Sequence, residues 1–166
     1  MSKPRKVQCY QYVNRPYEAV RELFHQRPLE AFQRATRSAA ERANAVEASL
    51  RAGVLGIDVG VDVRIQVQAI RDDDGVAGMS PVTRLTLAWE ATRALWLFPV
   101  MRAELSIFPL TSTETQLELE GAYDPPLGVL GNAADVVLGH RVAEATVHRF
   151  LDDVVEQIRR ELPANS

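Results

Sequence analysis

The chain has little of several features that mark particular protein classes. It contains a single cysteine, Cys9, so no disulfide bond can form within it. Its net charge is −3, without the excess of basic residues that nucleic-acid-binding proteins usually carry. No apolar run approaches the length of a membrane span, and the basic residues 1–6 lead into a strand pattern rather than an apolar signal segment. We therefore expect a cytoplasmic protein that has no membrane span and does not bind nucleic acid.

Patterns typical of cofactor and metal sites are also missing. The glycine pairs of residues 53–56 and 128–131 lack the Lys and Ser/Thr of a phosphate-binding loop. No two His, Cys or carboxylate residues recur at the spacing of metal ligands, so we expect no metal and no cofactor. The acidic run of residues 72–74 precedes Gly75, which predicts a solvated turn between two strands. Cys9, within a strand pattern, is expected to be a small core residue.

What the chain does have is regular alternation of apolar and polar residues. Its 166 residues are 46% hydrophobic and 25% charged, which suits one globular domain over residues 1–166. Each alternating segment has one apolar and one polar face, as in an antiparallel sheet with one face in water. The predicted strands cover residues 7–13, 57–70, 83–91, 102–108 and 116–123.

Helical patterns occupy the rest of the chain. The first helix is predicted over Tyr17–His25, with Asn14 as its N-cap, and a second helical segment runs from Pro28 to about Val46. A long amphipathic helix spans roughly Asn132–Leu162. Only the sheet offers an apolar face large enough to bury its stripe. We therefore expect an α+β fold, with a curved antiparallel sheet wrapped around a long C-terminal helix, two shorter helices after the first strand, and a pocket between sheet and helix.

Several segments in this order resemble a known family. They are the opening strand with residues 14–20, then residues 87–92, 97–100 and 123–128, and finally residues 140–147 with 150–151. The chain resembles the START-like (SRPBCC) superfamily of helix-grip proteins, and within it the bacterial polyketide cyclase/dehydrase-like group. The resemblance implies a helix-grip fold, but the group shares no catalytic signature. Its members bind lipids, sterols, polyketides, plant hormones or aromatic compounds, and include cyclases, dehydratases and carriers.

Three residues are candidates for the site. His140 falls on the helix stripe that faces the sheet, where it could act as a general acid or base, bind a ligand carbonyl, or only pack. Tyr123 ends the inward set of the last strand, with its hydroxyl either at the cavity mouth or bonded to the backbone. Trp89 is also inward and is expected to pack or line the cavity. Glu90 and Arg102 fall on the wet face and would point inward only if a bulge shifted the register.

The leading hypothesis is binding of a hydrophobic or aromatic small molecule, such as a lipid, sterol or polyketide, between sheet and helix. The expected ligand-binding residues are Leu85, Leu87, Trp89, Leu105, Leu119, Tyr123, Val136 and His140. One alternative is a cyclase- or dehydratase-type enzyme that uses His140 and Tyr123 for proton transfer. Another is a non-enzymatic interaction module with a filled core. A homodimer is compatible with the sequence, and the identity of the ligand is left open.

Overall fold

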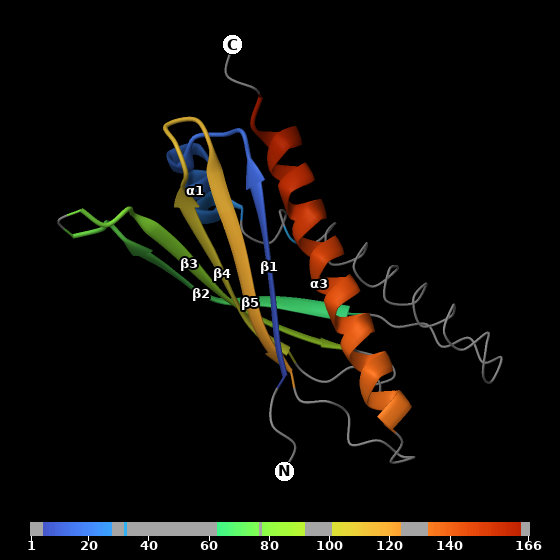
Figure 1. Ribbon diagram of the computed structural model, residues 1–166. Helices are drawn as coiled ribbons and strands as arrows, with labels where there is room; N and C mark the ends of the chain where they lie inside the picture. Colours follow the sequence, from blue (N-terminus) through green and yellow to red (C-terminus); the bar gives the residue numbers. More distant parts are fainter. Residues whose placement is uncertain are drawn as a thin grey trace.

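The computed structural model describes residues 5–27, 32, 63–76, 78–91, 101–123 and 133–163. Five strands and two helices lie within these residues (Figure 1). In chain order they are β1 (Arg5–Val13), α1 (Tyr17–Gln26), β2 (Val63–Asp73), β3 (Val82–Ala91), β4 (Met101–Pro109), β5 (Thr115–Tyr123) and α3 (Ala133–Glu161). No helix in this part of the chain combines the length and the apolar character needed to cross a membrane.

The five strands form one antiparallel sheet in the order β1-β5-β4-β3-β2. The alternation in the sequence is reproduced as burial: along β4, for example, Met101, Ala103, Leu105 and Ile107 are buried while Arg102 and Glu104 are exposed. α3 packs mainly against the inner side of β1 (Figure 1). The predicted α+β arrangement of a curved sheet, a short helix after the first strand and a long C-terminal helix is confirmed.

The core lies between the inner face of the sheet, α1 and the second half of α3. An aromatic stack joins these parts: the ring centroids of Phe24 and Phe32 are 5.4 Å apart, and those of Phe32 and Phe150 are 5.8 Å apart. All three rings are fully buried. Burying one such side chain contributes about 1.5–3 kcal/mol to the free energy of folding. This stack is therefore a major stabilising contact between α1 and α3.

Arg15 joins the start of α1 to the end of α3. Its Nε donates to the carbonyl of Leu162 at 2.6 Å and its Nη2 to that of Arg159 at 3.3 Å. These carbonyls belong to the end of a helix, where no further turn supplies donors and where a cation also complements the helix dipole. Arg15 therefore caps α3 from the opposite end of the sequence.

The first helix begins at Tyr17, as the sequence predicts, but its N-cap is a different residue. Its N-cap is Pro16, whose carbonyl accepts hydrogen bonds from the amides of Ala19 and Val20 at 3.1 and 3.2 Å. The prediction of Asn14 as N-cap is wrong, because Asn14 lies two residues too early for its side chain to cap this turn. The second predicted helix, residues 28–46, lies outside the described residues except for Phe32, which is helical.

The second strand continues beyond its predicted end. Residues 57–62 of the predicted strand lie outside the described residues, and β2 continues to Asp73. The pairing with β3 shifts by one residue between Val67 and Ala69, which is a β-bulge. Asp72 and Asp73 are therefore in the strand, and the prediction that they form a solvated turn is wrong.

Candidate functional site

Four of the predicted ligand-binding residues lie together on the inner face of the sheet. Leu85, Leu105 and Leu119 are directly opposite one another on β3, β4 and β5, and Leu87 lies in the adjacent row. All four are at most 1% exposed and belong to the core. Their predicted inward orientation is confirmed, while their contact with a ligand stays a prediction.

The next row toward the end of the strands contains two of the predicted aromatic residues. Met101 on β4 pairs with Trp89 on β3 and with Tyr123 on β5. Directly paired residues share a face of the sheet, and Met101 is buried on the inner one. The register thus brings the positions of Trp89 and Tyr123 to either side of Met101. The side chains of Trp89, Tyr123, Val136 and His140 lie outside what the structure describes.

The row that contains Leu87 lies between the row of Leu85 and the row of Met101, and small side chains make a depression in the inner face there. Leu87 is followed across the sheet by two small residues, Ala103 and Gly121. A Cβ atom added at Gly121 would lie 3.1 Å from Sδ of Met101 and 3.5 Å from Cβ of Ala103. The thioether of Met101 therefore reaches over the glycine. Methionine is unbranched and flexible, so this side chain can change rotamer at modest cost.

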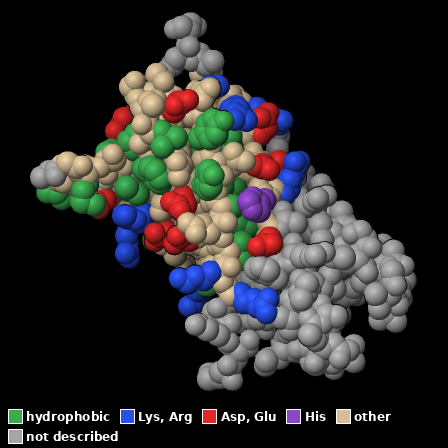
Figure 2. All heavy atoms as spheres, in the orientation of Figure 1, with side chains coloured by type: hydrophobic (Ala, Val, Ile, Leu, Met, Phe, Trp, Pro, Cys, Tyr) green, Lys and Arg blue, Asp and Glu red, His purple; other side chains and the backbone are tan. Residues whose placement is uncertain are grey.

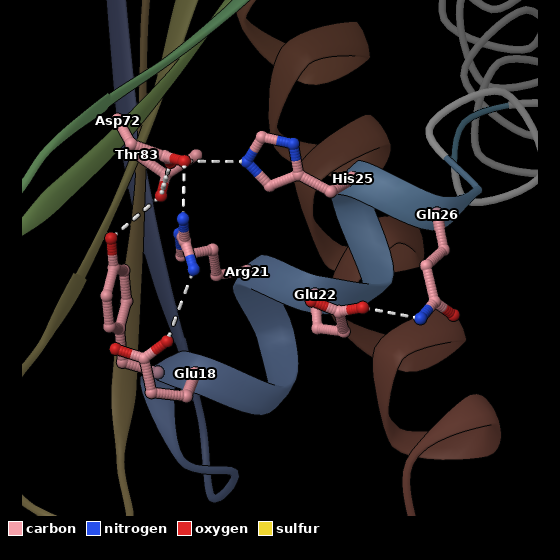
Figure 3. A network of polar contacts seen from close by, with 8 residues as sticks. Glu18, Arg21, Glu22, His25, Gln26, Asp72 and Thr83 are labelled. Atoms are coloured by element: carbon pink, nitrogen blue, oxygen red, sulfur yellow. Dashed lines mark hydrogen bonds and ion pairs between the residues drawn. The ribbon is translucent and has the colours of Figure 1, made fainter.

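A polar cluster at the opposite end of the inner face was missed by the sequence reasoning. We call it the Asp72 cluster: Tyr17, Arg21, His25, Asp72 and Thr83 (Figure 3). Oδ1 of Asp72 accepts from the Thr83 hydroxyl at 2.7 Å, and Oδ2 lies 2.8 Å from Nη2 of Arg21 and 2.9 Å from Nε2 of His25. The Tyr17 hydroxyl is 2.7 Å from that of Thr83. One carboxylate on β2 thus fastens both α1 and β3.

The bulge is the cause of this cluster. Before it, Val67 faces inward opposite Leu87; after it, Ile70 pairs with Leu85 and Asp72 with buried Thr83, so the inward parity has changed from odd to even. One signal in the sequence marks the change, since Ala69 and Ile70 are two apolar residues in succession within an alternating run.

The contacts of Asp72 favour its ionised form. The hydrogen bond from Arg21, helped by that from Thr83 and by the charge of His25, lowers the pKa of Asp72 from 3.8 to about 2 against the effect of burial. The same contact raises the pKa of Arg21, and burial raises the pKa of Tyr17. A carboxylate that accepts three hydrogen bonds and has so low a pKa is a poor general base near neutral pH. We therefore interpret the cluster as structural: it holds α1 against β2 and β3.

Cys9 is buried in the core, as predicted. Its Sγ lies 3.9 Å from the carbonyl of Val147 on α3. Burial, followed by the charge of Asp152, raises the pKa of the thiol to about 12. Since the thiolate is the reactive form, Cys9 is not a nucleophile in the folded chain.

A groove of about 370 Å³ runs along the exposed side of α3. Its lining is mostly charged and is paired within itself: Gln11 donates to Asp152 at 2.5 Å, and Arg149 lies 3.2 Å from Asp153. The lining residues are Gln11, Arg149, Asp152, Asp153, Val155, Glu156, Arg159 and Arg160. This is not a surface for an apolar ligand. Among the described residues, no group of three or more His, Cys, Asp or Glu side chains is placed to hold a metal ion.

No family model matches the chain, and no curated protein matches its sequence. Solved structures do match it. The protein TTHA0849 from Thermus thermophilus superposes with a TM-score of 0.55 at 11% identity, over 96% of this chain and 100% of that chain. The chain has the helix-grip fold. At such low identity the likeness concerns the fold alone, and in that respect it confirms the resemblance found in the sequence.

Two structures described as aromatase/cyclases also match. The Zhui aromatase/cyclase from Streptomyces sp. R1128 is 15% identical over 98% of both chains, with a TM-score of 0.49. The di-domain aromatase/cyclase BexL from the BE-7585A biosynthetic pathway is 14% identical over 94% of this chain and 50% of that chain, with a TM-score of 0.41.

The two ends of this helix grip differ in kind. At the end where Arg15 holds the C-terminus of α3, the Asp72 cluster and the aromatic stack occupy the inner face. α3 begins near the other end, where β5 finishes at Tyr123 (Figure 1). The backbone of His140, in the first half of α3, therefore lies toward the same end as the row of Trp89, Met101 and Tyr123.

Proposed function

We propose that the chain binds a hydrophobic or aromatic small molecule between the sheet and the first half of α3. The observation that carries the proposal is the low inner face at Ala103 and Gly121, overhung by the flexible side chain of Met101. A ligand that displaces the thioether would lie on two small residues, between the register positions of Trp89 and Tyr123. Burial of its apolar surface would contribute about 25 cal/mol per Å² before the costs of association.

The other predicted residues take supporting roles in this proposal. The apolar surface of the sheet beside the site consists of Leu85, Leu87, Leu105 and Leu119. In this proposal Val136 would face that surface from α3. His140 and Tyr123 would supply the few polar groups that orient a ligand in an otherwise apolar pocket.

Native mass spectrometry with a panel of fatty acids, sterols and aromatic polyketides tests the proposal. We expect at least one class to bind, and Ala103→Leu to weaken that binding about tenfold or more, which corresponds to about 1.4 kcal/mol. The matched control is Ala122→Leu, which places the same bulk on the exposed face of the neighbouring strand. Failure of every probe, or equal weakening by both variants, would count against the site and would favour an interaction module with a filled core.

The same experiment separates binding from catalysis. A cyclase- or dehydratase-type enzyme would use His140 and Tyr123 for proton transfer. A dehydratase would return a ligand that has lost water, whereas a cyclase would return a cyclised isomer or its dehydrated form, which chromatography separates from the starting ligand. A carrier would return it unchanged. His140→Ala should then abolish turnover while leaving binding intact, and weaker binding without any turnover would indicate that His140 only orients the ligand.

A further inference from the structure

The outer face of the sheet, opposite α3, carries exposed aromatic side chains. Tyr10 and Tyr12 on β1 are 68% and 53% exposed, and Leu110, just after β4, is 48% exposed. Figure 2 shows hydrophobic side chains gathered on the surface of the sheet, with acidic side chains beside them. Single exposed apolar residues are ordinary, but tyrosines on an open sheet face, next to charges of both signs, are typical of a protein interface.

The charges on this face are sorted by strand. The register places five outward residues in one row across the sheet, from β1 to β2: Tyr10, Glu118, Ser106, Arg84 and Arg71. The acid therefore lies on the β5 side of β4 and the two arginines on the β3 and β2 side. In the neighbouring row Tyr12, Gln116 and Phe108 follow one another on β1, β5 and β4.

We propose that this outer face binds the same face of a second copy of the chain, with the two-fold axis parallel to the strands and above β4. Rotation about this axis keeps each row at its height and exchanges the two sides of β4. Because adjacent strands are evenly spaced, about 4.8 Å apart, a residue on β5 faces the residue of the same row on β3 of the second copy. Glu118 then faces Arg84 of the second copy. Tyr10, two strands from β4, faces Arg71 of the second copy in a cation–π contact. The symmetry makes each contact twice.

The centre of this interface is Phe108. It lies on β4 and is therefore on the axis, where it meets Phe108 of the second copy. The side chain is half-buried in the single chain, and the contact would bury the remainder. Glu104, also on β4, would meet itself, and its ion pair with Arg84 at 3.6 Å offsets that repulsion only in part. Glu104 is thus the least favourable residue of the interface, which supplies a test of its own.

The arrangement of positive and negative side chains on the outer face favours a second copy of the chain over other binding partners. An anionic membrane surface or a nucleic acid needs a face of positive charge, whereas here Glu118 shares a row with Arg84 and Arg71, and the next row carries Glu104 and Glu120. A two-fold contact needs a face that complements itself, with opposite charges at equal distances on either side of the axis. The row through Glu118 and Arg84 satisfies that condition.

Sedimentation equilibrium of the full chain over a wide range of concentration tests the proposal. We expect a concentration-dependent dimer that Glu118→Arg and Arg84→Glu each weaken at least about tenfold. The double variant E118R/R84E exchanges the two charges and should restore much of the association. Glu104→Gln should tighten it. Arg159→Glu, on α3, is the matched control and should change nothing.

Thermal unfolding of each variant shows whether the single chain is still folded, which matters because Arg84 also lies 3.8 Å from Asp73 in its own chain. The charge exchange guards against that problem, because a purely local defect from Arg84→Glu would not be repaired by changing Glu118. A monomer at every concentration, a dimer indifferent to these charges, or a double variant no better than the singles would overturn the proposal.

Discussion

Replacing Asp72 with asparagine removes the charge at the centre of the Asp72 cluster but keeps an oxygen for the Thr83 hydroxyl. The pKa of Asp72 falls from 3.8 to about 2 on folding. At about 1.4 kcal/mol per pKa unit, this shift sets an upper limit of about 2.5 kcal/mol on what the charge contributes to the free energy of unfolding. The side chains of Arg21 and His25 are 33% and 38% exposed, so water screens both contacts. We therefore expect Asp72→Asn to lower the free energy of unfolding by about 1 kcal/mol at pH 7.

The pH dependence gives the effect its sign. The folded pKa of Asp72 lies below the unfolded value of 3.8, so the contribution of the charge is fully present above pH 3.8 and is lost as the pH falls through 2. Urea unfolding of parent and variant between pH 7 and pH 2 should show a constant difference in the upper part of that range. The difference should shrink at the acid end.

Two further variants complete the experiment. Asp72→Ala also removes the acceptor of the Thr83 hydroxyl, which is 0% exposed. The buried Tyr17–Thr83 pair then has two donors and one hydrogen bond, so this variant should cost about 1–3 kcal/mol more than Asp72→Asn. Asp74→Asn, an exposed acid two residues away, is the control and should be neutral. The reasoning is refuted if Asp72→Asn is as stable as the parent at pH 7, or if its deficit persists undiminished at pH 2.

Three other expectations follow from the fold. Arg15→Ala should lower the free energy of unfolding by about 1 kcal/mol and speed amide exchange in the last turn of α3, because two terminal carbonyls lose their donor; unchanged exchange there would contradict the cap. Cys9 should resist a thiol reagent in the folded chain and react on unfolding, because burial raises its pKa to about 12; rapid reaction under native conditions would contradict the burial. Deleting Gln68 should remove the bulge and leave Asp72 opposite buried Thr83, because the pairing from Ala69 onward then continues directly from that of Val67, so adding Asp72→Asn should still cost about 1 kcal/mol in urea unfolding; loss of that cost would show that Gln68 is not the extra residue of the bulge.

The sheet could be predicted because its chemistry repeats every second residue. Along β1, β3, β4 and β5 apolar and polar residues mostly alternate, and the sheet has one buried face. The odd or even position of a residue in its strand therefore assigns it to the inner or the outer face. The long C-terminal helix could be predicted for the same kind of reason. Its apolar stripe at helical spacing needs an apolar partner, and Phe150, Val154 and Ile158 are all fully buried against the core.

What could not be predicted depends on contacts between distant segments. The capping of α3 by Arg15 joins residues 147 positions apart in the chain, and nothing near Arg15 in the sequence indicates its partner. The Asp72 cluster depends on a one-residue shift in β2. The shift leaves a trace only in the pair Ala69–Ile70, which an alternating pattern treats as an irregularity. A change of parity then exchanges the faces of every later residue, and so an expected turn carboxylate becomes the anchor of α1.

At the candidate site, too, the sequence predicted which residues face inward but not how the strands pair. Parity identified Leu85, Leu87, Leu105 and Leu119 as inward, but each strand could slide by two residues against its neighbour without changing that assignment. Only the pairing places Met101 between Trp89 and Tyr123, and Ala103 beside Gly121. A ligand at the α1 end would have to separate Asp72 from its three donors and open the stack of Phe24, Phe32 and Phe150. At the other end it would have to move the side chain of Met101, which demands far less, and for that reason we propose that the ligand binds beside the first half of α3.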